Sequence, residues 1–336
     1  MSDIIIFVDR KQAKGGGQVV LEQLISNKIF ENSIVYLLTS NELSKKMIIG
    51  KNVKIFFSAD RIFEDIRSYP NNMTVALCSN TNSDLQGVAR LAKKIRDNGR
   101  PVKLISIVHS YPRNIFYRKI TKFLQSQYNI CLSVEPGISC SLPVTDNPPW
   151  LSICEAGPQV NSAMPTRKVK TFARPDRVKG LDIVPDIYRS LEEKGLICRV
   201  ALGESIDGDT KYEKYIRRSL SPWLEEFGKG PDWVEAGDIV LIPSLSETAC
   251  LTAQEVISRG AYVVSSRVGI LPYLFPEGGS IQTFPAGDIS GALAAFNNVL
   301  SLDENQFCTA CVTSSRIISS RAGLWYKYVA NRLQSL

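Results

Sequence analysis

The sequence predicts an α/β fold with two doubly wound domains, each built on a parallel sheet. Two observations carry this prediction. The chain has 336 residues, which exceeds one ordinary hydrophobic core and suits two domains of about 150 residues each. Short apolar runs rich in β-branched residues alternate with amphipathic stretches, a pattern typical of parallel strands covered by helices on both faces.

Each half of the chain shows this alternation. The first half contains six runs that predict strands: DIIIFVD, SIVYLLTS, VKIFF, MTVALCSN, VKLISIVHS and YNICLSV. QVVLEQLI and DLQGVARLAKKIRDNG, which lie between them, have helical periodicity. The second half contains five more predicted strands, KVKTFA, ICRVALG, DIVLIPS, AYVVSS and SIQTF, with helices predicted at DIVPDIYRSLEEKG and KYEKYIRRSLSPWLEEF.

The amino-acid composition changes between the two halves. Residues 142–168 are dense in proline, asparagine and glycine, and we expect the interdomain connection there. We therefore place the first domain at residues 1–155, the second at 156–315, and a helical tail at 316–336. The tail, SSRAGLWYKYVANRLQSL, is amphipathic with clustered aromatic residues, and we expect it to pack as a helix back toward the first domain.

Composition and charge narrow the functional classes. The start of the chain, MSDIIIFVDR, lacks the features of a signal peptide, and no run approaches a membrane span. Eight scattered cysteines, mostly within apolar runs, suit a reduced cytoplasmic protein, and the single CxxC pair of Cys308 and Cys311 lacks the second pair of a zinc site. Residues 1–130 hold 20 Lys and Arg against 10 Asp and Glu, whereas the remainder has a net charge of −3. The basic first half predicts an anionic partner, either a membrane surface or a phosphorylated acceptor. No sequence motif indicates that this partner is a nucleic acid.

Glu247 and Glu255 stand eight residues apart in PSLSETACLTAQEVISRG, between DIVLIPS and AYVVSS. The first apolar run predicts a buried parallel strand, and Leu251 to Arg259 predicts a helix that ends at Gly260. Glu247 is then in the strand-to-helix loop at the carboxyl edge of a sheet, where open α/β folds bind ligands. Because ionised carboxylates accept hydrogen bonds from vicinal diols, the pair indicates a hydroxyl-rich ligand, with acid–base catalysis left open.

Three further motifs follow predicted strands. Gly16 and Gly17, in KGGGQ, lack the GxGxxG spacing of a dinucleotide fingerprint, and either a substrate-facing loop or a plain tight turn explains them. Arg174 and Lys179, in FARPDRVKGLD, either clamp phosphate groups or belong to a solvated basic loop. His109, the only histidine, is either structural or a hydrogen-bond donor across a cleft.

Two other segments also have alternative interpretations. Asp207-Gly-Asp209 is a DxD string that can hold a divalent cation, but its polar surroundings favour a solvated loop. Arg113 to Leu124, RNIFYRKITKFL, mixes cations with Phe and Ile. It predicts a helix packed on the sheet, a surface docked on anionic lipid, or both.

The order of these motifs resembles the family-4 retaining glycosyltransferases of the GT-B fold. A glycine loop after the first strand is followed by a histidine near residue 110, then by R-x4-K-G and E-x7-E. The resemblance is strongest over residues 170–300 and weaker in GGGQVVLEQL and ISIVHSYP. It implies two Rossmann-like domains facing across a cleft, with an activated sugar bound mainly by the second.

The resemblance also implies roles for the individual residues. Arg174 and Lys179 would hold the diphosphate and neutralise charge on the leaving group. Glu255 would bind the ribose diol, Glu247 the sugar hydroxyls, and His109 would reach the sugar from the first domain. The remaining donor-binding positions would be Thr248, Ala249, Cys250, Leu251, Thr252, Gly16 and Gly17. The family needs no divalent metal or protein nucleophile, because the leaving phosphate assists removal of the acceptor's proton.

The sequence also departs from the family pattern. Thr248-Ala249-Cys250 stand where the family commonly has Gly-Phe-Gly, so Cys250 would crowd the approach of the backbone to the sugar. SICEAGPQV replaces the family's Asn-Gly hinge signature, and little sequence separates Phe227 from DIVLIPS, which shortens the base-binding loop.

We therefore expect a cytoplasmic retaining glycosyltransferase, at the inner face of the membrane, that uses a nucleotide diphosphate sugar and no other cofactor. Its acceptor would be a glycan or a lipid-linked molecule in bacterial surface polysaccharide or glycoconjugate biosynthesis. One alternative is a GT-B-fold sugar-nucleotide epimerase or hydrolase, which would turn over the donor without an acceptor. Another is a non-catalytic partner subunit, which the departure at Cys250 favours.

Overall fold

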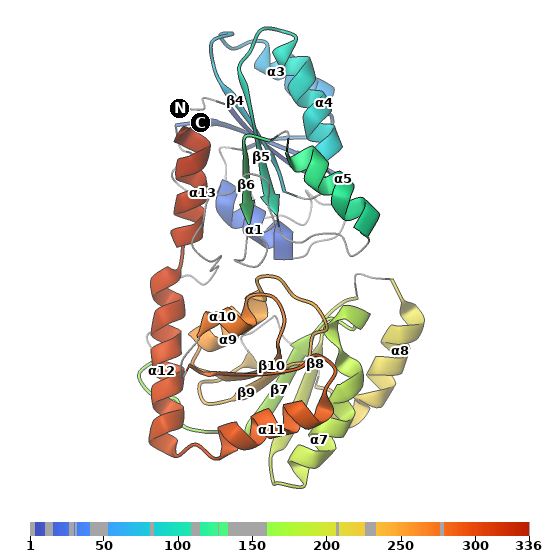
Figure 1. The fold of residues 1–336 in the computed structure, drawn as a ribbon, viewed down its shortest axis with the longest axis vertical. Helices are drawn as coiled ribbons and strands as arrows, with labels where there is room; N and C mark the ends of the chain where they lie inside the picture. The colour runs from blue at the N-terminus through green and yellow to red at the C-terminus, as the bar shows by residue number, and fades with distance from the viewer. Residues whose placement is uncertain are drawn as a thin grey trace. The chain divides into compact units, whose positions relative to one another are not determined.

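The computed structural model describes residues 4–10, 16–26, 30, 32–40, 53–80, 84–108, 115–126, 128–133, 160–205, 208–225, 233–275 and 279–335. The chain divides into two compact units (Figure 1). The first comprises Met1–Leu151 together with Gly323–Leu336, and the second comprises Ser152–Ala322. Most of the predicted interdomain connection, residues 142–159, lies outside the described residues.

The first unit alternates strands and helices along the chain. Its described elements are β1 (Ile4–Asp9), α1 (Gly16–Ile25), β2 (Ile34–Thr39), β3 (Val53–Phe56), α3 (Ala59–Ile66), β4 (Val75–Ser79), α4 (Leu85–Arg96), β5 (Val102–Val108), α5 (Ile115–Gln125), β6 (Ile130–Ser133) and α13 (Leu324–Ser335). The strands form a six-stranded sheet in the order β3-β2-β1-β4-β5-β6, and all their pairings are parallel. The chain crosses back from β3 to β4, so the direction of winding reverses between β1 and β4.

The sequence pattern explains why these strands lie inside. All six residues of β1 are buried, and the buried side chains of β2, β4 and β5 form a core with α3 and α4. Such continuous apolar runs are characteristic of parallel strands covered on both faces. The terminal helix α13 belongs to this unit and contacts α1, as the sequence predicts. It begins at Leu324, however, and residues 316–321 of the predicted tail are the end of α12 in the second unit.

The second unit repeats the architecture on a smaller sheet. Its described elements are β7 (Lys168–Ala173), the short 3-10 turns η3 (Arg177–Lys179) and η4 (Leu181–Ile183), α7 (Val184–Glu192), β8 (Ile197–Leu202), α8 (Thr210–Ser219), η5 (Ser221–Trp223), β9 (Ile239–Ile242), α9 (Leu251–Ser258), β10 (Tyr262–Ser266), α10 (Leu271–Leu274), β11 (Ile281–Phe284), α11 (Ile289–Leu300) and α12 (Glu304–Arg321). The five strands pair in parallel in the order β11-β10-β9-β7-β8. Each of the eleven predicted strands is therefore present, and the prediction of two doubly wound parallel-sheet units is confirmed.

Two predicted helices differ from the structure. α1 begins at Gly16, two residues before the predicted start, so Gly16 and Gly17 form its first turn instead of a loop. The helix predicted over residues 211–227 is interrupted, because α8 ends at Ser219 and a 3-10 turn with Pro222 follows. Proline lacks the N–H of a helix interior and disfavours helical backbone at the preceding residue, which explains the break.

No helix among the described residues has the length and hydropathy needed to cross a membrane.

Candidate functional site

The second sheet has a topological switch point between β7 and β9. From β7 the chain moves outward to β8 and then crosses to β9 on the other side of β7 (Figure 1). Loops that leave such neighbouring strands diverge, and open α/β sheets bind ligands beside them at the carboxyl ends. The loop after β7 carries Arg174 and Lys179, and the loop after β9 carries Glu247. The structure therefore places three predicted site residues at one sheet edge.

Arg174, the first residue after β7, is held by a buried carboxylate. Its Nη1 atom lies 3.3 Å from Oδ2 of Asp176, whose side chain is only 1% exposed. The Oδ1 atom of Asp176 accepts a hydrogen bond of 2.8 Å from the hydroxyl of Ser205, which follows β8. Asp176 thus links the loops after β7 and β8 and restricts where the half-buried guanidinium can lie.

Lys179 and Glu247 form an ion pair between the loops after β7 and β9. The Nζ atom of Lys179 lies 2.6 Å from Oε1 of Glu247, and both side chains are largely shielded from solvent. The hydroxyl of Ser244 donates to the same oxygen at 2.7 Å. Among the described residues, both contacts of this carboxylate use Oε1, and its second oxygen, Oε2, takes part in neither.

The backbone also ties these two loops together. The N–H of Leu245 donates to the carbonyl of Val178 at 2.8 Å. Gly180 has a φ of +61°, and a Cβ at this position would lie 2.2 Å from the carbonyl oxygen of Pro243. Only glycine permits this approach, so the glycine of the K-G motif sets the separation of the loops.

The N-terminus of α9 faces the same edge, and an unusual residue forms it. Cys250 is the N-cap residue and has left-handed backbone angles, φ 40° and ψ 66°. The carbonyl of Thr248, two residues before Cys250, accepts a hydrogen bond of 2.8 Å from the N–H of Ile270. Gly269 also approaches this carbonyl so closely that a Cβ would lie 2.3 Å from its oxygen. The loop from Glu247 to α9 is therefore fixed from the β10 side as well.

The side chains of Ala249 and Cys250 are buried, so these two residues present mainly their backbone to a ligand. The carbonyl of Ala249 accepts a hydrogen bond of 2.7 Å from Gln254. Burial raises the pKa of the Cys250 thiol, and the negative charge of Glu247 raises it further. The thiol is therefore protonated at neutral pH and does not suit the role of a nucleophile.

Helix α9 supplies the other predicted donor-binding residues. Leu251 and Thr252 open the helix, where N–H groups and the positive end of the helix dipole favour an anion. Glu255 is half-buried and lies one turn further along, on the same face as Leu251. Because the Cα–Cβ bonds of a helix are tilted toward its N-terminus, the side chain of Glu255 leaves the backbone on the side of the first turn.

The remaining predicted residues, His109, Gly16 and Gly17, belong to the first half of the chain. His109 lies outside the described residues. Gly16 and Gly17 belong to the first unit, where α1 begins after the carboxyl end of β1.

The first unit has a polar cluster at its own switch point that the sequence analysis did not identify. The buried carboxylate of Asp9, the last residue of β1, accepts hydrogen bonds from Asn80 at 2.7 Å and from Gln18 at 3.0 Å. Asn80 directly follows β4. A polar residue closing each of two apolar strand runs was the available signal. The same signal, a polar residue just past a strand, could have identified Asp176, Ser205 and Ser244 in the second unit.

The DxD string has a structural role where the structure describes it. Asp209 is the N-cap of α8, and its Oδ1 atom accepts from the N–H of Tyr212 at 3.0 Å. Its Oδ2 atom accepts from Nε of Arg177 at 3.0 Å. These contacts, that of Tyr212 first, lower the pKa of Asp209. Asp207 lies outside the described residues, within which no group of three His, Cys, Asp or Glu is arranged to hold a metal ion.

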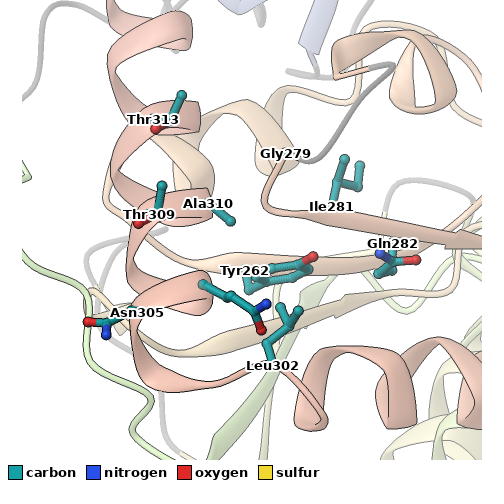
Figure 2. A pocket seen from close by; sticks show the side chains of 10 residues that line it. Tyr262, Gly279, Ile281, Gln282, Leu302, Asn305, Thr309, Ala310 and Thr313 are labelled. Atoms are coloured by element: carbon teal, nitrogen blue, oxygen red, sulfur yellow. The ribbon is translucent and has the colours of Figure 1, made fainter.

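A hollow of about 610 Å³ also exists in the second unit, but it is unrelated to these residues (Figure 2). It lies between α12 and the edge of the sheet and is lined by uncharged side chains, among them Tyr262, Gln282 and Thr309. Tyr262 and Ile281 begin their strands, so the hollow is near the amino ends of the strands and not their carboxyl ends. A lining without cations does not suit a diphosphate.

The chain is similar over its whole length to several solved structures. HepE from Anabaena, solved in complex with UDP and glucose, has a TM-score of 0.76 and 16% identity, covering 99% of both chains. HepE has also been solved with UDP-glucose. A glycosyltransferase from Rickettsia africae has a TM-score of 0.73 and 11% identity, covering 99% of this chain and 98% of its own. Sucrose-phosphate synthase from Thermosynechococcus elongatus has a TM-score of 0.71 and 13% identity, again covering 99% and 98%.

These likenesses define the fold as GT-B, as the sequence predicts. No protein-family profile and no curated protein sequence matches the chain.

Proposed function

We propose that the protein is a retaining glycosyltransferase that moves a sugar from a nucleotide diphosphate sugar to a glycan or lipid-linked acceptor. The observation that supports it is the meeting of Arg174, Lys179 and Glu247 with the N-terminus of α9 at one sheet edge. A diphosphate requires cations and N–H donors, and a sugar requires acceptors for its hydroxyls. This edge offers all of these groups, and HepE, which shares the fold, has been solved with UDP-glucose.

In this proposal Arg174 and Lys179 bind the diphosphate. Their positive charges stabilise the negative charge that grows on the leaving phosphate as the bond to the sugar breaks. Lys179 is already hydrogen-bonded to Glu247, so the same cation can contact the phosphate and position the carboxylate. The Oε2 atom of Glu247 is then available to accept hydrogen bonds from hydroxyls of the transferred sugar.

The nucleoside part of the donor would bind along α9. The carboxylate of Glu255 accepts hydrogen bonds from both hydroxyls of the ribose. The N–H groups of Leu251 and Thr252 donate further hydrogen bonds to the phosphates. The backbone around Thr248, Ala249 and Cys250 borders the sugar.

The proposed reaction proceeds by attack on the face that the leaving group departs from, with the leaving phosphate accepting the acceptor's proton. It requires no protein nucleophile, and we expect no divalent metal. The buried, protonated thiol of Cys250 is consistent with this route. We also propose that the protein acts in the cytoplasm in bacterial surface polysaccharide or glycoconjugate biosynthesis.

The test is nucleotide-sugar binding followed by turnover. A thermal-shift screen with UDP, GDP, ADP and dTDP sugars should identify one base, since a ligand at a hundred times its Kd adds about 2.7 kcal/mol to the stability of the folded state. Lys179→Ala should weaken that binding about tenfold or more, because it removes a charge-assisted hydrogen bond. The exposed residue Lys211 on α8 provides the control, and Lys211→Ala should bind as the unmodified protein does.

Three outcomes would contradict the proposal in different ways. Failure of every nucleotide sugar to shift the melting temperature would exclude the donor site. Product formed equally well without any acceptor would identify a hydrolase or epimerase. Binding without turnover in the presence of candidate acceptors would identify a non-catalytic subunit.

A further inference from the structure

Helix α5 of the first unit exposes four large apolar side chains and buries two uncharged polar ones. Phe116, Phe123 and Ile120 are 67%, 65% and 36% exposed. These residues recur at spacings of four and three, which places them on one face of the helix. The opposite face packs inward and carries Thr121 and Gln125, which are 6% and 0% exposed.

This arrangement is the reverse of an ordinary surface helix. A helix on a soluble domain turns its apolar stripe toward the core and its polar face toward water. Tyr117 adds a fourth exposed apolar side chain and a third exposed ring to α5, at 61%, and contacts Phe116 edge-on at 6.0 Å between ring centroids. Four of the thirteen large apolar side chains that the described residues expose lie on this one helix of 11 residues. Such a cluster marks an interaction surface.

The charges of α5 indicate the kind of partner. Its sequence, IFYRKITKFLQ, contains three basic residues and no acidic one. Lys119 is exposed beside the aromatic stripe. Lys122, about one turn further along the helix, is half-buried and lies closer to the inner face. Residues 1–130 as a whole have twice as many Lys and Arg as Asp and Glu. Two copies of this surface would bring like charges together, which disfavours a homodimer through it.

We propose that the exposed face of α5, formed by Phe116, Tyr117, Ile120 and Phe123 with the flanking Lys119, is an interfacial docking surface for a membrane rich in anionic lipid. Aromatic side chains favour the level of the headgroups, where the ring is partly buried and its edge stays wet. A helix lying in the plane of the interface places its apolar face about 5–10 Å into the headgroup boundary and its cations among the anionic headgroups. The inference goes beyond the proposed transfer reaction and does not depend on the donor site.

Vesicle sedimentation with the full chain tests the docking surface. The protein should bind vesicles made of equal parts phosphatidylcholine and phosphatidylglycerol, and bind vesicles of phosphatidylcholine alone much more weakly. High salt should weaken the first interaction, because exposed charges are screened. Binding that is equal on both vesicles, or absent from both, would overturn the proposal.

Two variants separate the apolar and the electrostatic contributions. Phe116→Ser with Phe123→Ser should weaken binding to the mixed vesicles at least tenfold, since each buried phenylalanine contributes about that factor or more. Phe57→Ser is the matched control, because Phe57 is 52% exposed but is not on α5. Binding that the control lowers as much as the double variant does would contradict a role specific to α5.

Neutralising the exposed lysine tests the second contribution. Lys119→Gln should weaken binding about fivefold on mixed vesicles, the contribution of one cation near an anionic surface. The matched control is Lys211→Gln, on an exposed position of α8. Equal losses in the two variants would show that only net charge matters and would overturn the assignment to α5.

Misfolding and self-association of the chain are distinguished from membrane docking by two further measurements. Each variant should keep its melting temperature and its response to the nucleotide sugar, which separates a lost membrane surface from misfolding and from a failed donor site. Analytical ultracentrifugation should show the same oligomeric state for the unmodified protein and the phenylalanine variant. A dimer that the phenylalanine substitutions dissociate would show that a second copy covers this face, contrary to the proposal.

Discussion

The backbone conformation of Cys250 leads to an unusual prediction about the stability of two variants at this position. This residue begins α9 with φ 40° and ψ 66°, and its side chain is 5% exposed. The left-handed backbone conformation costs a residue with a Cβ about 1–2 kcal/mol, whereas glycine adopts it without this cost. Cys250→Gly therefore removes backbone strain, and Cys250→Ala retains it.

Loss of buried side-chain atoms opposes this gain. Both variants lose the thiol, and glycine loses one more carbon, worth about 0.8 kcal/mol for a buried group of this size. The relieved strain of about 1–2 kcal/mol exceeds this loss. Cys250→Gly should therefore be more stable than Cys250→Ala by a few tenths to about 1 kcal/mol. At an ordinary helix position glycine is about 1 kcal/mol less stable than alanine, so the expected sign is reversed.

Urea denaturation of the full-length variants, followed by far-UV circular dichroism, measures this difference. Ala253→Gly is the matched control, because Ala253 is fully buried within the same helix. It should lose about 1–2 kcal/mol from helix propensity and the missing methyl group. If Cys250→Gly were less stable than Cys250→Ala by a similar amount, the argument from backbone strain would be refuted.

Three further predictions concern buried polar groups. Asp176→Asn should raise the Kd for a nucleoside diphosphate about tenfold in calorimetry, because it removes the charge that orients the neighbouring guanidinium; an unchanged Kd would contradict that role. Burial keeps the pKa of Cys250 high, so its thiol should resist iodoacetamide at about pH 8 in peptide mapping while the half-buried Cys308 reacts, and equal labelling would show that Cys250 is accessible. Lys170→Met should destabilise the protein by about 3–5 kcal/mol in urea denaturation. The buried carboxylate of Asp238, whose Oδ2 atom lies 2.6 Å from Nζ of Lys170, would then lack its cation. Lys168→Met, which breaks an exposed ion pair, should cost less than about 1 kcal/mol, and similar losses in the two variants would refute the distinction.

The strands could be predicted from sequence because burial on both faces leaves a strong local signal. IIIFVD, VALCS and IVLI are continuous apolar runs, and each is a buried parallel strand in the structure. Helix ends were harder to predict. The periodicity of KYEKYIRRSLSPWLEEF continues past Ser219, but Pro222 interrupts the helix there.

The candidate site could be predicted only in part. The sequence indicated that Lys179 and Glu247 follow strands, but not that those strands are neighbours. They lie 68 positions apart, and only the strand order β9-β7-β8 makes them partners. The contact of Ser205 with Asp176 has the same origin, since it joins loops that follow adjacent strands. Side-chain contacts between loops depend on sheet order, which local patterns do not contain.

The two ion pairs have a consequence for how a donor would be exchanged for product. Arg174 is paired with Asp176 and Lys179 with Glu247, so each of these two cations already has a carboxylate partner. In the proposed site an incoming diphosphate would share Lys179 with Glu247, and the sugar hydroxyls would stabilise the carboxylate in return. Once the sugar has been transferred, Glu247 would face the product phosphate without that compensation, and repulsion between the two anions would favour release. Sugar recognition and product release would then be two properties of one carboxylate.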